Sequence, residues 1–513
     1  MESMGWIWAT VAAFIFIHLL RRILLTKTAR NAMPPGPRGL PILGHLHLLG
    51  SNPHRVLHDL ARKHGPIMGL RLGSVPTVVV SSPAAAELVL RTHDATFAGR
   101  PRQDGFQYIS YGQKNLAFGP YGPYWREMRK LCTAELLSTV KINQFLPMRE
   151  AEMQLLVRSL RQAGERREAV DLSTKLVTVV RDMNCLMLFG KKFGEDGDDL
   201  DDKKFKDVIL EASVLGAKFN LADFFPYVGA LDLQGINRKM KELAKIFDGI
   251  LEKIIDNHVQ KKKKRGGSEA AAPAPAEDFV GTMMGILESG KATFKFDRTH
   301  VKAILLDMLI AGTDSAATVT DWALTELIRH PEKMKRLQRE VEGVVGGRDR
   351  MVGTAAEQLE KMEYLDQVVK ETLRLHTIAP LMLPHEALEE CVLEGFRIPK
   401  KARVMVNIWA ILRDPDVWPD PESFVPERFE GRRVDMSGQH FELIPFGAGR
   451  RSCPGRQVGL LVVKLLLSQL VHCFDWELPD GLRPADLDMS EIFSIVTCRA
   501  DHLNVIPVYR LSQ

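Results

Sequence analysis

The sequence is poor in the residues that build disulfide or zinc scaffolds. Its 513 residues contain six cysteines, widely spaced and with no C-x-x-C pair among them, which disfavours both a disulfide framework and a structural zinc site. The chain also has no N-x-[ST] sequon, which is compatible with a body that faces the cytosol. Most of the cysteines are therefore expected to be small core hydrophobes; they are Cys132, Cys185, Cys391, Cys453, Cys473 and Cys498.

Neither charge nor hydrophobicity is extreme. The 69 basic and 64 acidic residues leave a net charge of +5, and no basic stripe with interleaved aromatic residues is present, so the sequence predicts no nucleic-acid partner. A composition of 45% hydrophobic, 26% charged and 7% aromatic residues is that of an ordinary globular protein and excludes a multi-span membrane protein. The length suffices to bury a sizeable core.

One long hydrophobic run is present, at the N-terminus. Residues 5–20 are apolar apart from His18, and Arg21 and Arg22 follow directly. With the apolar residues beyond the arginines, the run approaches the roughly 20 residues that cross a bilayer. Basic residues after the run place the rest of the chain on the cytoplasmic side. Residues 1–30 are thus predicted to be a single-pass membrane anchor rather than a cleaved secretory peptide, since a basic n-region and a cleavage site are lacking.

Proline then interrupts the chain. Residues 31–44, which include "MPPGPRGLPILG", are predicted to form a stiff, extended hinge, because proline cannot continue a helix. The body, residues 45–513, has apolar residues mainly at helical spacing and short β-branched runs near Thr77 and Val404. It is predicted to be mainly α with a minor β component. Residues 261–277, a lysine block that runs into Gly, Ser, Ala and Pro, are predicted to be a flexible linker.

The longest helical pattern runs over residues 298–329 and contains poor helix formers at its centre. Gly312, Asp314 and Ser315 all have low intrinsic preference for a helix interior. A Ser315 hydroxyl bonded to the carbonyl of Ala311 would loosen the backbone ladder and leave room for a small ligand. From this stretch alone, a tolerated irregularity is an equally good interpretation.

The segment "KETLRLH" places Glu371 and Arg374 on one face of a helix. Such a pair arises often by chance in a charged chain. If the pair is buried, each ion needs further bonds, because a half-paired buried charge costs about 3–5 kcal/mol. Arg428 in "PERF" is a candidate third member.

A single cysteine, Cys453, follows two arginines in "PFGAGRRSCPGRQ". The third glycine of a dinucleotide-binding loop is absent, so that interpretation is rejected. Cys453 precedes a long apolar helical pattern, and the positive end of a helix and its free N–H groups favour a thiolate. Gly449 and Gly455 would let the backbone approach a flat ligand, and Arg451 offers a fork for an anionic group.

The order Phe446-x-x-Gly449-x-Arg451-x-Cys453-x-Gly455 resembles the haem-binding signature of the cytochrome P450 monooxygenases. The segments "WREMR", "AGTDS", E-x-x-R and "PERF" follow in that family's order and, with the proline hinge, cover almost the whole chain. The sequence looks like that of a plant microsomal member of the clan that oxidises secondary metabolites. The resemblance implies the cytochrome P450 fold and a haem-thiolate monooxygenase that contains haem b.

The resemblance also carries roles onto single residues. Cys453 would be the axial iron ligand, whose electron donation favours O–O cleavage. Asp314 and Ser315 match the acid–alcohol pair that relays protons during dioxygen activation. Glu371, Arg374 and Arg428 match a structural triad. The remaining matches contact the haem, with Trp125, Arg129, His385 and Arg451 at the propionates and Phe446, Gly447 and Gly455 on the proximal side.

Two positions depart from the family pattern. Ser315 stands where threonine is usual, so the hydroxyl is kept and the methyl lost, which implies less efficient coupling of electrons to product. Thr377 stands where a proline usually follows the E-x-x-R histidine, which affects the nearby substrate loop. Neither departure removes a required group.

Partners and substrate follow from the resemblance as expectations. No flavin or nicotinamide motif is present, so electrons would come from an NADPH–haemoprotein reductase in the endoplasmic reticulum membrane, docking at a basic face that includes Arg126 and Lys130. The segments that match substrate-recognition regions are apolar or aromatic, which favours a small lipophilic substrate, a flavonoid or other phenolic first and a terpenoid as the alternative. A reductase-independent isomerase or dehydratase and a haem sensor stay open, although the Asp314–Ser315 pair argues against both. The expected lining residues are Phe106, Tyr108, Tyr111, Phe118, Leu215, Phe219, Leu309, Ile310, Thr313, Ile378, Ala379, Leu381, Met382, Phe493 and Ile495.

Overall fold

Helices dominate the structure and strands are short, as predicted. The computed structural model describes residues 33–193, 208–209, 211–212, 214–216, 218–265, 277–346 and 356–511. The α-helices are α2 (Pro53–His64), α3 (Pro83–Glu87), α4 (Phe106–Ile109), α5 (Pro123–Leu131), α6 (Thr139–Gln144), α7 (Leu146–Glu165), α8 (Leu172–Phe189), α10 (Ile236–Arg265), α11 (Phe279–Ser289), α12 (Arg298–Arg329), α13 (Pro331–Val345), α14 (Ala356–Glu360), α15 (Glu363–Leu375), α16 (Ile408–Ile411) and α17 (Arg456–Cys473).

Short helical turns and strands connect these helices. The turns are η1 (Leu46–Leu48), η2 (Leu88–Thr92), η3 (Cys132–Leu136), η4 (Leu221–Asp223), η5 (Pro226–Leu231), η6 (Pro426–Phe429), η7 (Gly449–Arg451), η8 (Pro479–Gly481) and η9 (Pro484–Asp486). The strands are β1 (Ile67–Leu72), β2 (Val75–Val80), β3 (Val170–Asp171), β4 (His385–Glu386), β5 (Cys391–Leu393), β6 (Phe396–Ile398), β7 (Arg403–Val406), β8 (Phe474–Glu477), β9 (Glu491–Ile492), β10 (Cys498–Arg499) and β11 (Asn504–Tyr509).

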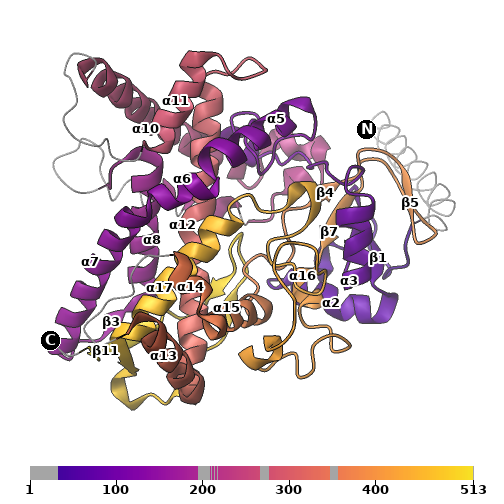
Figure 1. Cartoon of the computed structure of the whole chain (residues 1–513). Helices are drawn as coiled ribbons and strands as arrows, with labels where there is room; N and C mark the ends of the chain where they lie inside the picture. The colour runs from indigo at the N-terminus through magenta and orange to yellow at the C-terminus, as the bar shows by residue number, and fades with distance from the viewer. Residues whose placement is uncertain are drawn as a thin grey trace, which may run out of the picture.

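The largest sheet has the order β1-β2-β7-β4. The β-branched runs predicted near Thr77 and Val404 form its two central strands, β2 and β7, which pair in parallel with Thr77 opposite Arg403. The other pairings are antiparallel. The sheet lies to one side of the helical body (Figure 1) and ends, at β4, with the candidate haem residue His385.

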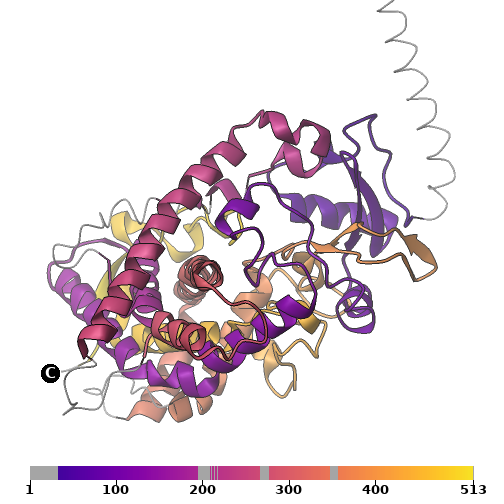
Figure 2. The ribbon, with the colours of Figure 1, turned by 90° about the horizontal axis from the view of Figure 1, so that it is seen from above.

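Helix α12 passes through the centre of the helical body, with the bounds predicted from the sequence. Asp297 caps it through a capping box with His300, in which each residue's side chain bonds the other's backbone N–H. Seen along its axis in Figure 2, α12 lies in the middle, with α10 crossing on one side and the sheet on the other. It packs against α8, α15 and α17, so it presents different faces to several parts of the fold.

The apolar helices α12 and α17 are core helices. Both are long and apolar enough to cross a membrane, but 61% of the most hydrophobic window of each is buried inside the molecule. The predicted anchor, residues 1–30, lies outside the described residues.

The predicted hinge is extended but lies against the sheet. Gly69 N–H of β1 donates to Pro35 O over 2.9 Å, and a Cβ atom on Gly36 would lie 1.9 Å from Gly69 O. The described part of the hinge, from residue 33 onward, is therefore bonded to the body rather than free of it. The first residues of the predicted linker, Lys261–Arg265, continue α10 as a helix. Residues 266–276 lie outside the described residues.

Candidate functional site

The Cys453 loop is shaped by glycines. Its backbone closes through a bond from Cys453 N–H to Phe446 O of 2.9 Å. Gly447 and Gly449 have φ angles of 69° and 66°, in the left-handed region that favours glycine. A Cβ atom on Gly449 would lie 2.0 Å from Leu90 O, so no side chain fits there. At Gly455 a Cβ would make only ordinary contacts, 3.7 Å from Val458 Cγ1 and 3.9 Å from the sulfur of Cys453.

The thiol of Cys453 has accessible surface although it lies deep in the fold. Burial raises its pKa, and the N–H groups of Gly455 and Arg456 with the charge of Arg129 oppose the rise only in part. The donors predicted at the start of α17 are therefore present, but burial outweighs them. A metal cation bonded to the sulfur would deprotonate it outright.

A buried cluster of cations lies beside this loop. Burial, together with the neighbouring charges of Arg100 and Arg129, lowers the pKa of Arg451 to about 9. Burial likewise lowers the pKa of Arg100 to about 9 and that of His385 to about 3. Within the described residues, none of the three guanidinium groups forms an ion pair with a carboxylate. His385 Nδ1 donates to Phe97 O over 2.7 Å, while its buried Nε2 has no hydrogen-bond partner among the described residues.

Haem b fits this set of donors. Buried cations without a counter-charge cost several kcal/mol, and two propionates would neutralise them. No group of three or more His, Cys, Asp or Glu side chains within the described ranges is arranged to hold a metal ion. Cys453 would instead anchor an iron that is carried by haem. Arg100 was missed by the sequence interpretation, because nothing in its local pattern indicates burial.

Trp125 and Arg451 also hold a loop of backbone. Trp125 Nε1 donates to Leu116 O over 3.0 Å, and Arg451 donates to Ala98 O, Leu116 O and Gly119 O over 2.8, 3.2 and 2.6 Å. The Arg451 guanidinium lies 4.0 Å over the Trp125 ring. The predicted haem residues on α5 and in the cysteine loop are thus brought together. Arg129 joins them through a 3.3 Å bond from Nη2 to Ser452 Oγ.

The centre of α12 contains the hydroxyl-to-carbonyl bond that the sequence suggested, within a continuous helix. Ser315 Oγ donates to Ala311 O over 2.9 Å. One turn earlier, Asn184 of α8 donates to Leu309 O over 3.2 Å, and a Cβ on Gly312 would lie 2.9 Å from its amide nitrogen. Burial raises the pKa of Asp314. The local helix therefore offers a hydroxyl and a carboxyl beside carbonyls whose bonding is shared with side chains.

The Glu371–Arg374 pair is fully buried, with both side chains 0% exposed. Arg374 donates to Glu371 over 2.7 and 2.9 Å, and Arg428 donates to the same carboxylate over 3.0 Å. Arg374 uses its other N–H groups on the carbonyls of Leu412, Pro421 and Ser423. Each ion is thus satisfied, as a buried pair requires, and the triad joins α15 to η6.

Several predicted lining residues from distant segments meet. Phe106 and Phe118 stack with ring centroids 4.3 Å apart. A Cβ on Gly216 would lie 2.6 Å from the Phe106 ring and 2.8 Å from Ile495 Cδ1, so these segments are in contact. Tyr111 differs: its ring lies 5.4 Å from Lys302 Nζ, and burial together with Asp248 raises its pKa, which places it among charges. Thr377, where proline is usual, bonds back to Leu373 O and Arg374 O.

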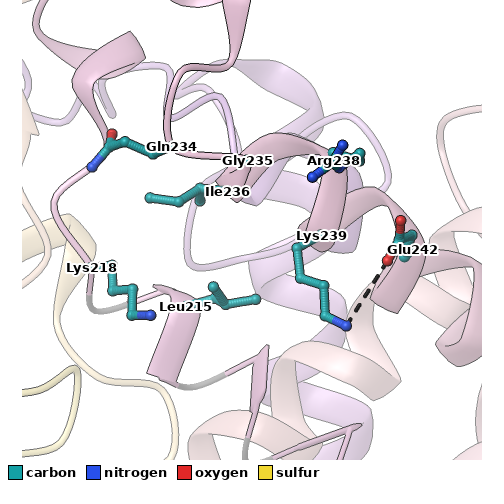
Figure 3. A pocket seen from close by; sticks show the side chains of 8 residues that line it. All are labelled: Leu215, Lys218, Gln234, Gly235, Ile236, Arg238, Lys239 and Glu242. Atoms are coloured by element: carbon teal, nitrogen blue, oxygen red, sulfur yellow. Dashed lines mark ion pairs between the residues drawn. The ribbon is translucent and has the colours of Figure 1, made fainter.

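A separate surface cavity of about 610 Å³ lies at the start of α10 (Figure 3). Lys239 and Glu242, 3.9 Å apart, form an ion pair on its wall. Its lining is mostly polar or charged, and of the predicted lining residues only Leu215 takes part; the walls are Leu215, Lys218, Gln234, Gly235, Ile236, Arg238, Lys239 and Glu242. This cavity holds none of the predicted catalytic or haem residues.

Comparison with known proteins identifies the family. The family model described as Cytochrome P450 matches residues 34–502. The chain belongs to the cytochrome P450 family. Members of this family are haem-thiolate monooxygenases, so this cytochrome P450 binds haem b and acts on a lipophilic substrate with O2 and electrons from a redox partner. A zebra fish cytochrome P450 structure with abiraterone superimposes with a TM-score of 0.74 at 25% identity, covering 90% of this chain and all of the other.

Plant members of the family are similar over nearly the full length. Cytochrome P450 CYP736A12 from Panax ginseng is 47% identical over 94% of both chains. Flavonoid 3'-monooxygenase CYP75B137 from Crocosmia x crocosmiiflora is 40% identical over 99% of this chain and 98% of its own. Costunolide synthase from Cichorium intybus is also 40% identical, over 94% of both chains. Two relatives with different names have the same sequence identity to this chain, so identity does not determine its substrate.

Proposed function

We propose that this cytochrome P450 hydroxylates a small lipophilic plant secondary metabolite, with flavonoids and other phenolics as the first class. The observation that carries the proposal is the stacked Phe106–Phe118 pair, with Gly216 placed between the Phe106 ring and Ile495, which brings apolar side chains from separate segments together. Aromatic rings stack well on such a surface. Relatives at 40% identity include both a flavonoid 3'-monooxygenase and a costunolide synthase, so identity alone does not choose between the phenolic class and the alternative.

Cys453 is proposed as the iron ligand and the cation cluster as the propionate site. Bound haem supplies the activation of dioxygen, for which a thiolate ligand is suited. Arg129, Arg451 and His385 would bind the carboxylates. Trp125 would hold Arg451 in place from its ring face. Phe446, Gly447 and Gly455 would line the side of the haem on which Cys453 lies.

Asp314 and Ser315 are proposed to deliver protons. Burial raises the pKa of Asp314, which favours the protonated form that can donate a proton. The Ser315 hydroxyl, bonded to Ala311 O, can turn to donate elsewhere, because a hydroxyl rotates about its C–O bond.

Electrons are proposed to come from an NADPH–haemoprotein reductase at the endoplasmic reticulum membrane, with residues 1–30 as the anchor. Arg126 and Lys130 are exposed on α5, while Trp125 and Met128 of the same helix face inward. The exposed cations thus lie on the outer side of the helix that carries two haem residues. Charge complementarity to an acidic partner would steer association there.

A screen of microsomes tests the substrate class. Membranes that contain this protein and a reductase would be incubated with phenolics and terpenes, with NADPH omitted in the control. We expect NADPH- and O2-dependent hydroxylation of a phenolic. Turnover of terpenes alone would support the terpenoid alternative, and product without NADPH would support an isomerase or dehydratase.

Replacement of Cys453 tests the ligand. We expect Cys453→Ala to lose the carbon monoxide spectrum typical of thiolate-ligated haem, because its only proposed protein ligand is gone. The matched control is Cys473→Ala, since the Cys473 sulfur only accepts a bond from Gln469 inside the core. A retained thiolate spectrum in Cys453→Ala would refute the assignment.

A further inference from the structure

One carboxylate of α12 holds the segment that precedes α5. Asp307 accepts from Asn115 Nδ2 over 2.9 Å, from Leu116 N over 3.0 Å and from Ala117 N over 3.1 Å. No pattern in the sequence indicated Asp307, because it lies in an apolar helical stretch two turns before Ser315. Its partners all come from residues 115–117, so a single carboxylate of the helix binds this segment.

Burial of the Asp307 carboxylate does not by itself stabilise the fold. Burial raises the pKa of Asp307 to about 6, although its three hydrogen bonds oppose the rise. Within the described residues, no cation forms an ion pair with it. A buried carboxylate without a counter-ion contributes little to stability. A fully bonded buried polar group does, however, fix one arrangement of the groups that it joins.

The hydrogen bonds of Asp307 are linked, through Asn115, to the stacked Phe106–Phe118 pair. The Asn115 side chain that donates to Asp307 also accepts, at Oδ1, from Phe118 N over 3.2 Å. Phe118 stacks on Phe106. Asp307 therefore determines, through Asn115, where the backbone of Phe118 lies and hence where the stacked rings lie.

The hydrogen bonds of Asp307 are also linked, through Leu116, to the cation cluster. Leu116, whose N–H donates to Asp307, accepts at its carbonyl from Trp125 and from Arg451. The peptide unit between Leu116 and Ala117 thus donates its N–H to Asp307 and accepts at its carbonyl from Trp125 and Arg451. A shift of this unit would move the rings relative to the haem site.

We propose that Asp307 is a positioning residue that sets the distance between the Phe106–Phe118 pair and the haem, and so selects ligands by the size of the part that reaches the rings. The inference rests on the proposed substrate site, but it does not depend on which lipophilic molecule binds. Asp307 touches neither haem nor substrate in this role.

The test uses the holoenzyme and two neutral iron-binding probes, unsubstituted 1,2,4-triazole and a phenyl-substituted triazole. The variant is Asp307→Asn. The matched control is Asp321→Asn, another acid of α12 whose pKa is raised by burial, but which accepts from Ser173 Oγ on α8. Spectral titration gives each dissociation constant, and hydrogen exchange reports on residues 105–120.

In Asp307→Asn we expect about tenfold weaker binding of the phenyl probe, which corresponds to the loss of roughly one net hydrogen bond to a charged group, with unsubstituted triazole within about twofold of wild type. Exchange over residues 105–120 should be faster. Asp321→Asn should leave the ratio of the two constants unchanged. Equal weakening of both probes, or an unchanged ratio with unchanged exchange, would overturn the inference.

Asn115→Ala is the second variant in case Asp307→Asn does not fold, since it removes one of the three bonds and the bond to Phe118. It should shift the ratio in the same direction by about threefold. A normal thiolate carbon monoxide spectrum in these variants separates the two proposals. With that spectrum present, an unchanged ratio refutes the role of Asp307 and leaves the proposed function standing, whereas its absence in wild type would refute the haem site.

Discussion

At the scale of single residues, Ser315 is the departure with the clearest chemical consequence. Its hydroxyl bonds back to Ala311 O, as the sequence predicted. A serine lacks the methyl that restricts the side-chain rotation of threonine, so its hydroxyl has more freedom to turn away from the site. The proton delivery proposed for Asp314 and Ser315 therefore depends on a loosely held group.

Substitution at Ser315 tests this delivery. In Ser315→Ala we expect product per NADPH to fall roughly tenfold while NADPH oxidation continues, because a positioned proton donor contributes at least that much to a step. The electrons should be recovered as hydrogen peroxide. Ser315→Thr is the matched variant, and we expect it to equal or exceed wild type in product per NADPH. Undiminished coupling in Ser315→Ala would count against the relay.

Some site residues were predictable and others were not. Cys453, Asp314 and Ser315 belong to short runs of unusual composition that the sequence displays directly. Arg100 and Asp307 are single charges in ordinary surroundings, and their importance comes from burial among partners at positions 383 and 115, which local sequence does not contain. Such residues become visible only when the fold brings distant backbone to them.

At the scale of elements, the prediction was most accurate where the sequence pattern was long. The bounds of α12 match the predicted 298–329, because the apolar periodicity extends over many residues and Asp297 caps the first turn. The structure describes only the ends of the predicted linker, residues 261–277. Its first residues, Lys261–Arg265, are helical and extend α10. Lysine is a good helix former, so a charged block can continue a helix that is already formed.

The triad that joins α15 to η6 allows a stability prediction. We expect Arg374→Met to destabilise the protein by about 3–5 kcal/mol, because Glu371 would stay buried with part of its charge unpaired. The measurement is the melting temperature and the yield of thiolate haem protein. Arg397→Met is the control, since its pair with Glu390 is exposed and worth little. Similar melting temperatures for the two variants would contradict the structural role.

At the scale of the whole molecule, the chain is held by bonds that join its two ends. Glu491 of β9 accepts from Arg55 over 2.8 Å and bonds His54 over 2.9 Å, across 436 and 437 residues. His54 stacks on Phe493, one of the predicted lining residues. No periodicity or motif predicts such a bond, because it exists only once the helical body has brought α2 and the C-terminal strands together.

The bonds of Glu491 make part of the free energy of unfolding depend on pH. Burial raises the pKa of Glu491, but the bonds from His54 and Arg55 lower it to about 2, below the ordinary value of 4.5. A lowered folded pKa gives stability that is present above about pH 4.5 and lost as the pH falls toward 2. Glu491→Gln should therefore be about 1–2 kcal/mol less stable than wild type at pH 7, after allowance for screening, and the deficit in urea unfolding should shrink at about pH 3. Glu477→Gln, which breaks an exposed pair with Arg167, should show a deficit near zero at both pH values. A Glu491→Gln deficit of the same size at both would show that the charge of the carboxylate does not stabilise this junction.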